Sequence, residues 1–200
     1  MAERKIRVLH LIDSYRIGGP GKTIMNSVRF IDSSRYELVV ASFAPQDESL
    51  NEFGAAVSHA GIPYHGLVER KRFDLSQAGV LRKLLSREKI DIFHSHGYKS
   101  DVLGYLACRR LPGTAFVTTH HGWIENRTSQ KVFTHLALTL TRAMDGVVCV
   151  ASHLMDRLPS RVRHSGKATL IHNALYCRTT CREIIAHRSG PIWGSARAKR

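Results

Sequence analysis

Residues 6–31, IRVLHLIDSYRIGGPGKTIMNSVRFI, decide the fold expected for this chain. Residues 6–12 form a short apolar run that ends at Asp13, which predicts a buried strand. A glycine-rich turn follows, and residues 22–31 carry apolar side chains at helical spacing. A strand, a tight turn and a helix in this order form the repeating unit of α/β domains.

The rest of the chain repeats this alternation. We predict further strands over residues 36–43, 62–66, 90–94, 115–119, 146–151 and 168–172. The predicted helices between them cover residues 48–60, 74–88, 99–110, 129–144 and 152–158. This alternation predicts an α/β fold, a single Rossmann-like domain with a mostly parallel sheet and helices on both faces.

Length and composition set the domain organisation. Two hundred residues, 43% of them hydrophobic, suit one α/β domain with a real core. We assign residues 1–175 to this domain and residues 176–200 to an atypical basic tail. Residues 177–200 contain six Lys or Arg against the single acidic residue Glu183, a net charge of +5. This composition differs from that of the domain.

The net charge of +14 limits the classes of partner. It suits acidic nucleotides and anionic lipid, whereas the scattered basic residues, without interleaved aromatic residues, argue against nucleic acid. No apolar run approaches the roughly 18 residues that cross a bilayer, and the four cysteines show no paired framework. We expect a cytoplasmic protein with reduced thiols.

Two segments suggest peripheral contact with an anionic membrane: the basic run at residues 70–72 and the amphipathic stretch 129–144. The alternative is that the first is a solvated loop and the second a core helix.

The first loop, RIGGPGKT at residues 16–23, is a candidate anion site. In an open parallel sheet, ligands bind where the strands end, and a helix start presents free N–H groups to an anion. A P-loop would need a glycine where Arg16 stands, and the dinucleotide fingerprint needs another glycine spacing. A tight turn without a ligand is the simpler alternative. The candidate residues of this loop are Gly18, Gly19, Pro20 and Gly21.

Histidines gather at the same predicted edge. His94 and His96 follow one strand, and His120 and His121 follow the next. Neutral imidazoles bind zinc, but no zinc-site spacing is present, so we predict no metal site. Histidines in a cleft also donate hydrogen bonds to hydroxyls and phosphate. We select His121 and His96 for such a role and expect most of the others to be structural.

Five motifs in order resemble family-4 retaining glycosyltransferases. They are the opening strand, Gly-Gly loop and helix; IDIFHSHGYKSDVLG; THHG; GVVCVASHL; and ATLIHNAL. The resemblance covers about residues 5–175. Each motif by itself is unspecific, and their order and spacing together carry the resemblance.

The resemblance implies the N-terminal half of a GT-B fold, in which two Rossmann-like domains face each other across a cleft. The N-terminal domain binds the acceptor, here a glycan or lipid in polysaccharide biosynthesis. The C-terminal domain binds a nucleotide sugar as co-substrate, with no tightly bound cofactor and no metal. Gly18 and Gly19 would approach the donor phosphates, and His121 would contact the donor sugar near the reacting carbon. The cleft would also contain His96, Tyr98, Gly122 and Ser152.

The chain departs from the family pattern near its end. Asn173 is followed by Ala174 instead of glycine, and residues 176–200 show no Rossmann pattern. We therefore expect the donor-binding domain to be absent from this sequence, through truncation, a frame shift or a split enzyme, although a genuine basic tail is an alternative. The isolated chain should then transfer sugar poorly. A non-catalytic nucleotide- or sugar-binding module with the same fold is the alternative function.

Overall fold

The computed structural model describes residues 4–14, 16–44, 51–70, 74–122 and 128–173. Within them, seven strands form one sheet in the order β3-β2-β1-β4-β5-β6-β7, and every neighbouring pair is parallel. The predicted parallel sheet is therefore confirmed. The strands are β1 (Ile6–Ile12), β2 (Tyr36–Ala44), β3 (Tyr64–Val68), β4 (Ile92–His96), β5 (Ala115–His120), β6 (Gly146–Cys149) and β7 (Ala168–Leu170). The predicted tail lies outside the described residues.

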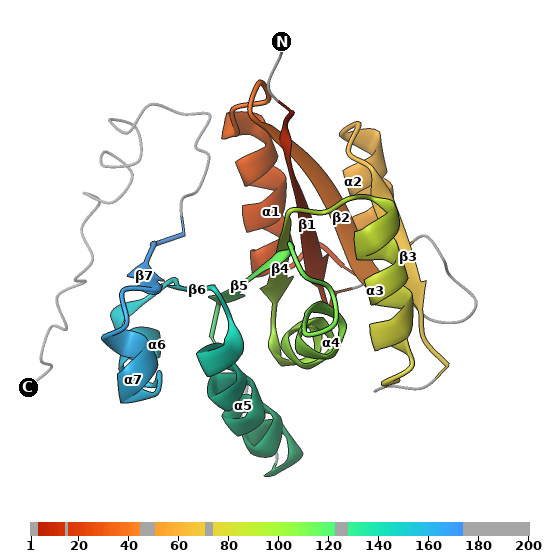
Figure 1. Ribbon diagram of the computed structural model, residues 1–200. Helices are drawn as coiled ribbons and strands as arrows, with labels where there is room; N and C mark the ends of the chain where they lie inside the picture. The colour runs from red at the N-terminus through yellow and green to blue at the C-terminus, as the bar shows by residue number, and fades with distance from the viewer. Residues whose placement is uncertain (1–3, 15, 45–50, 71–73, 123–127, 174–200) are drawn as a thin grey trace, which may run out of the picture.

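Helices cover both faces of the sheet, as predicted (Figure 1). On one face, α1 (Gly19–Phe30) and α2 (Glu52–His59) pack through Ile24, Phe53 and Val57 onto β1 and β2. On the other face lie α3 (Gln77–Arg87), α4 (Tyr98–Cys108), α5 (Thr128–Leu140), η1 (Thr141–Ala143), α6 (Ser152–Asp156) and α7 (Ser160–Arg163). Side chains of a strand alternate between faces, so successive residues of β1 belong to different cores: Val8 to one and Leu9 to the other.

Two boundaries differ from the sequence prediction in ways that affect the site. Helix α1 starts at Gly19 instead of residue 22, because Pro20 has a backbone suited to the first helical turn. Strand β4 runs over Ile92–His96 instead of 90–94, after Lys89 reverses the chain with a positive φ of 49°. This shift places both His94 and His96 inside the strand. The short helix α7 had no sequence prediction.

The strand order reverses beside β1. From β1 the chain builds outward through β2 to β3, then returns to place β4 on the other side of β1. The crevice at such a reversal, beyond the carboxyl ends of the strands, is where open α/β sheets bind ligands. The loops after β1, β4 and β5 all lead away from this edge of the sheet.

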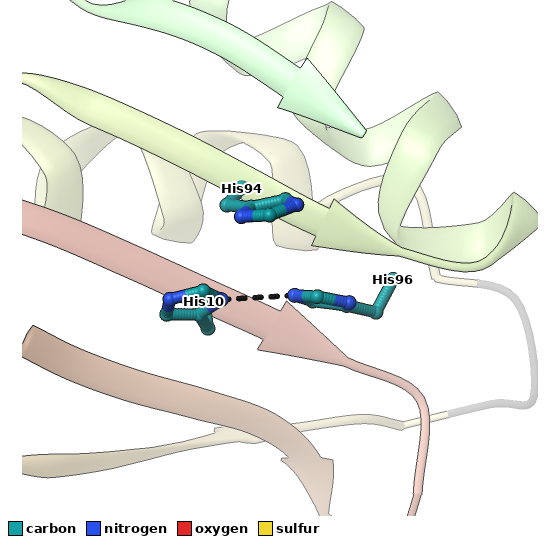
Figure 2. Close-up of side chains that lie close together, drawn as sticks. All are labelled: His10, His94 and His96. Carbon is teal, nitrogen blue, oxygen red and sulfur yellow. Dashed lines mark hydrogen bonds between the residues drawn. The ribbon is translucent and has the colours of Figure 1, made fainter. Parts of the chain in front are cut away.

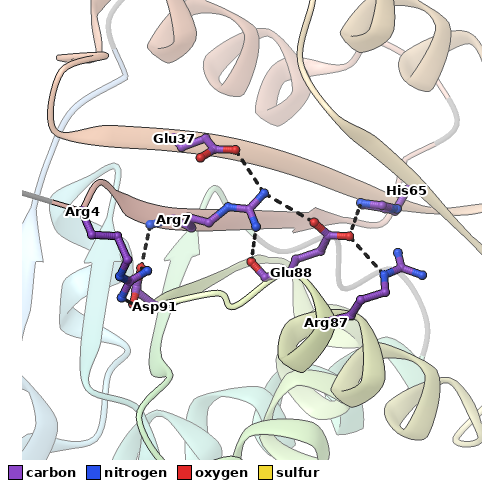
Figure 3. Close-up of polar contacts among 7 residues, drawn as sticks. All are labelled: Arg4, Arg7, Glu37, His65, Arg87, Glu88 and Asp91. Carbon is purple, nitrogen blue, oxygen red and sulfur yellow. Dashed lines mark hydrogen bonds and ion pairs between the residues drawn. The ribbon is translucent and has the colours of Figure 1, made fainter.

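A polar network closes the opposite, amino-terminal edge of the sheet (Figure 3). Arg7 of β1 is its centre: its guanidinium donates to Glu37 of β2 and to Glu88 after α3, and its backbone N–H donates to Asp91. Arg4 donates two further hydrogen bonds to Asp91. These contacts connect the starts of β1, β2 and β4, at the edge of the sheet opposite the glycine loop, His96 and His121.

None of the described helices is both long and apolar enough to cross a bilayer. Among the described cysteines, Cys108 and Cys149 are free thiols.

Candidate functional site

A crevice of about 280 Å³ lies at the carboxyl edge of the sheet beside β1, β4 and β5. Residues from four segments line it: Asp13 after β1, Pro20 in α1, the turn that begins α4, and the end of β5. Gln130 and Thr134 of α5 complete the wall. The crevice therefore forms where the reversal of strand order predicts a ligand site.

Five of the predicted site residues meet in this crevice: Pro20, His96, Tyr98, His121 and Gly122. His96 is the last residue of β4, and Tyr98 opens α4 and stacks on Phe133 with ring centroids 5.4 Å apart. Gly122 has a φ of 112°, a left-handed conformation that glycine adopts without strain, and it turns the chain directly after His121. The sequence prediction had placed these residues at one edge, and the structure brings them together.

The remaining predicted residues lie around the crevice without lining it. Gly18 caps α1 and Gly19 is its first residue; a Cβ atom on either would meet no atom within 4 Å. At Gly21 a Cβ would lie 3.1 Å from the Phe53 ring, so this glycine serves the packing of α1 on α2. Ser152 is exposed at the start of α6 and lines neither this crevice nor the larger cavity next to it.

The larger cavity, of about 630 Å³, lies on the α1 face of the sheet. Thr23, Ile24 and Phe30 of α1 form one wall, and side chains of β4, β5 and β6 form its floor. His96, Thr119 and His121 border both cavities. These three residues therefore lie between the crevice and the larger cavity.

Four histidines of the α1 face form one cluster. His10 Nδ1 lies 2.9 Å from His96 Nε2, and His96 Nδ1 lies 3.0 Å from His121 Nε2 (Figure 2 shows the first contact). His94 stacks against His96 with ring centroids 4.4 Å apart, and its Nε2 is 2.7 Å from Thr119 Oγ1. Strands β1 and β4 are paired so that His10 faces His94, which explains why these rings meet.

Burial keeps these imidazoles neutral. It lowers the pKa of His10 and of His121 to about 4 and the pKa of His96 and of His94 well below the ordinary 6.5. The neighbouring histidines lower the pKa of His94 and His96 further, since adjacent positive charges repel. Each ring near neutral pH therefore has one N–H donor and one acceptor nitrogen.

His10, His94 and His96 each place one nitrogen within 4.8 Å of the others, close enough to consider a metal. Two nitrogens on one tetrahedral zinc lie roughly 3.3 Å apart, and zinc lies in the plane of each ring. The 2.9 Å contact of His10 with His96 is shorter, and His94 is stacked on His96 and tilted against His10. This geometry favours a hydrogen-bonded stack. The absence of a metal ligand set stays a prediction.

The first turn of α4 fixes the loop that follows His96. Lys99 reaches 2.5 Å from Glu69 and 3.4 Å from Asp13, and all but 5% of its side chain is buried. Ser100 Oγ accepts a hydrogen bond from the His96 backbone N–H. Asp101 accepts hydrogen bonds from Ser95 at 2.5 Å and Thr118 at 2.7 Å. Three consecutive polar side chains thus attach this turn to its surroundings.

Sequence reasoning missed His10, Asp13 and Lys99. His10 lies inside an otherwise apolar strand, and a polar residue at a buried strand position is the signal that could have identified it. Asp13 was read as the end of a strand, and Lys99 as an ordinary helix residue. Their partners are distant in the sequence, so no local pattern marks them.

A parallel sheet with a strand-order reversal, a helix that begins at a glycine, and a crevice at the carboxyl edge of the sheet define a Rossmann-like α/β domain. The model of Glycosyltransferase Family 4 matches residues 17–177, and the chain belongs to this family. Among curated proteins, none matches its sequence.

Solved structures share the fold at low sequence identity. HepE of Anabaena, solved in complex with UDP, is 14% identical with a TM-score of 0.68, over 92% of this chain and 49% of HepE. MurG of Acinetobacter baumannii is 11% identical with a TM-score of 0.60, over 86% of this chain and 46% of MurG. A UDP-N-acetylglucosamine 2-epimerase is 14% identical with a TM-score of 0.63, over 85% of this chain and 49% of the epimerase. The chain therefore spans about half the length of the structures it matches.

Proposed function

We propose that this domain forms the acceptor side of a glycosyltransferase that moves a sugar from a nucleotide-sugar donor to a glycan or lipid acceptor with retention of configuration. The observation that carries this proposal is the single crevice in which Pro20, His96, Tyr98, His121 and Gly122 meet. The activity of the whole enzyme is part of this proposal, because the chain matches only about half of each solved structure.

The start of α1 suits the donor diphosphate. Gly18 and Gly19 have no positive φ, and a side chain at either would enter open space, so the fold itself does not require glycine there. A ligand that approaches the backbone closely would require it. No acidic side chain occupies the first turn of α1, so its free N–H groups and helix dipole favour an anion.

His121 suits the reacting end of the donor. Its ring is neutral near pH 7, and its Nδ1 is buried with no hydrogen-bond partner among the described residues. An unsatisfied buried nitrogen costs about 1–3 kcal/mol, which a hydrogen bond to a sugar or phosphate oxygen would remove. A donor positioned where charge develops stabilises the leaving diphosphate.

A binding experiment tests the donor site. The complete enzyme, labelled with ¹⁵N, is titrated with UDP-glucose, and we expect amide shifts at Gly18, Gly19 and His121. Gly18→Ala should weaken this binding at least tenfold, because its methyl group fills the space that the phosphates enter. Gly79→Ala is the matched control, since its Cβ also meets nothing within 4 Å but lies in α3, away from the crevice.

Two results would contradict the proposal. Shifts confined to residues outside the crevice, or equal affinity of Gly18→Ala and Gly79→Ala, would exclude the α1 start as the phosphate site.

An assay of sugar transfer separates an enzyme from a non-catalytic binding module. His121→Ala in the complete enzyme should lower turnover while the free energy of unfolding changes little. If the complete enzyme binds UDP-glucose but transfers sugar to no glycan or lipid acceptor, the non-catalytic binding module is favoured.

A further inference from the structure

Three imidazoles form a linear chain of hydrogen bonds from the middle of the sheet to the crevice. His10 Nδ1 meets His96 Nε2 at 2.9 Å, and His96 Nδ1 meets His121 Nε2 at 3.0 Å. Figure 2 shows His10 and His96 edge to edge, with His94 lying over them. His96 thus uses both ring nitrogens on other histidines, and His121 is the end of the chain at the crevice.

Counting protons along this chain leaves two arrangements. A neutral imidazole has one N–H, and each N···N contact needs one donor and one acceptor. If His96 donates from Nε2 to His10, its Nδ1 must accept from His121 Nε2–H. If His96 donates from Nδ1 to His121, its Nε2 must accept from His10 Nδ1–H. All three rings therefore carry the proton on Nε2, or all three carry it on Nδ1.

We propose that His10 and His96 are positioning residues that fix the orientation of His121 and couple its tautomer to theirs. The free Nδ1 of His121 is then an acceptor in the all-Nε2–H state and a donor in the all-Nδ1–H state. One proton shift along each hydrogen bond, with a proton exchanged at each end of the chain, converts one state into the other, and the number of protons is unchanged.

The surroundings support this coupling. His10 and His96 are only 8% and 7% exposed, so most of each ring is removed from solvent. Burial lowers the pKa of all three rings, which prevents a protonated ring from replacing the two neutral states near pH 7. His94 shares the burial and the stacking, but its Nε2 contacts Thr119 and it stands outside the chain.

The consequence for ligands rests on the proposed function. A phosphate oxygen only accepts hydrogen bonds, so a nucleoside diphosphate at His121 selects the all-Nδ1–H state. A sugar hydroxyl both donates and accepts, so it binds either state. Strand β1 thereby influences the chemistry that the end of β5 presents to the crevice.

Long-range ¹H–¹⁵N spectra of histidine-labelled protein test the coupling without any ligand, so the outcome is independent of nucleotide binding. We expect His10, His96 and His121 to show the same tautomer at pH 7.5, with ¹⁵N–¹⁵N couplings across both contacts. His10→Phe keeps an aromatic ring but removes the first nitrogen, and we expect His121, two rings away, to shift toward averaged tautomers. His94→Phe is the matched control and should leave the tautomer of His121 unchanged.

Several outcomes would overturn the inference. Different tautomers at His10 and His121 in the wild-type chain would break the proton count, and this test needs no variant to fold. A folded His10→Phe protein with an unaltered His121 spectrum would show that the coupling is absent. Stoichiometric shifts of His10, His94 and His96 on adding zinc chloride alone would assign the cluster as a metal centre instead.

Discussion

The buried carboxyl group of Asp101, in the first turn of α4, provides a test of how burial affects ionisation in this fold. Its side chain is fully buried, one carboxylate oxygen accepts from Ser95 and Thr118, and the other has no hydrogen-bond partner among the described residues. Burial raises the pKa of Asp101 to about 7, although the two hydroxyl donors oppose this effect. Asp101→Asn keeps the shape of the side chain and removes the titrating proton.

The sign and size of the effect follow from the raised pKa. Asp101 ionises near 3.8 in the unfolded chain and near 7 in the folded one, so its contribution to stability is full below pH 3.8 and is lost as the pH rises to 7. The loss is about 4 kcal/mol in all, at 1.36 kcal/mol per pKa unit. About 2 kcal/mol of it falls between pH 5.5 and 8. Asparagine does not ionise, so the Asp101→Asn protein does not lose this stability as the pH rises.

Urea unfolding of both proteins at pH 5.5 and at pH 8 measures the effect. The free energy of unfolding of Asp101→Asn relative to wild type should rise by about 2 kcal/mol over this range. The buried histidines change stability in the opposite direction, but they are common to both proteins and cancel in the difference. Asp91→Asn is the control: contacts with Arg4 lower the pKa of Asp91, so its difference from wild type should not change with pH. A constant difference for Asp101→Asn would refute the reasoning.

Two further predictions concern packing and buried charge. A Cβ on Gly104 would lie 2.2 Å from the Phe93 ring, so Gly104→Ala should lower the free energy of urea unfolding by about 1–3 kcal/mol. Gly79→Ala should instead raise it by roughly 0.5–1 kcal/mol, because its Cβ meets no atom within 4 Å. Equal effects of the two substitutions would contradict the packing argument. Lys99→Met leaves Glu69 buried without its cation and should lower the free energy of unfolding by about 3–5 kcal/mol. Adding Glu69→Gln should restore most of this loss. A double variant as unstable as Lys99→Met would contradict the argument from buried charge.

The sequence predicted the sheet because each strand is a short apolar run separated by a helical pattern. Strand ends were less predictable: the prediction ended β4 at His94, whereas the structure continues it to His96. Pairing with β1, which no local pattern specifies, sets that register and places His94 opposite His10. The parallel arrangement allowed the edge of the sheet to be predicted, and with it five residues of the crevice.

Contacts between distant segments explain what the sequence could not show. The glycines of the first loop looked equivalent, yet Gly18 faces open space and Gly21 packs against Phe53 of α2. Ser152 lies after a strand at the correct edge, but β6 is two strands from β4, and the serine lines neither cavity. The donor, the acceptor, the retention of configuration and the role of His121 stay predictions.

The first turn of α4 has a consequence for the energetics of recognition. Successive side chains attach this turn to its neighbours: Lys99 to the connection between β3 and α3, Ser100 to β4, and Asp101 to β5. The peptide that carries Gly97 and Tyr98 is therefore already ordered before anything binds. A loop that must be ordered on binding loses conformational entropy, roughly 1–2 kcal/mol for each backbone residue. Here that loss occurs during folding, which leaves more of the contact energy for affinity.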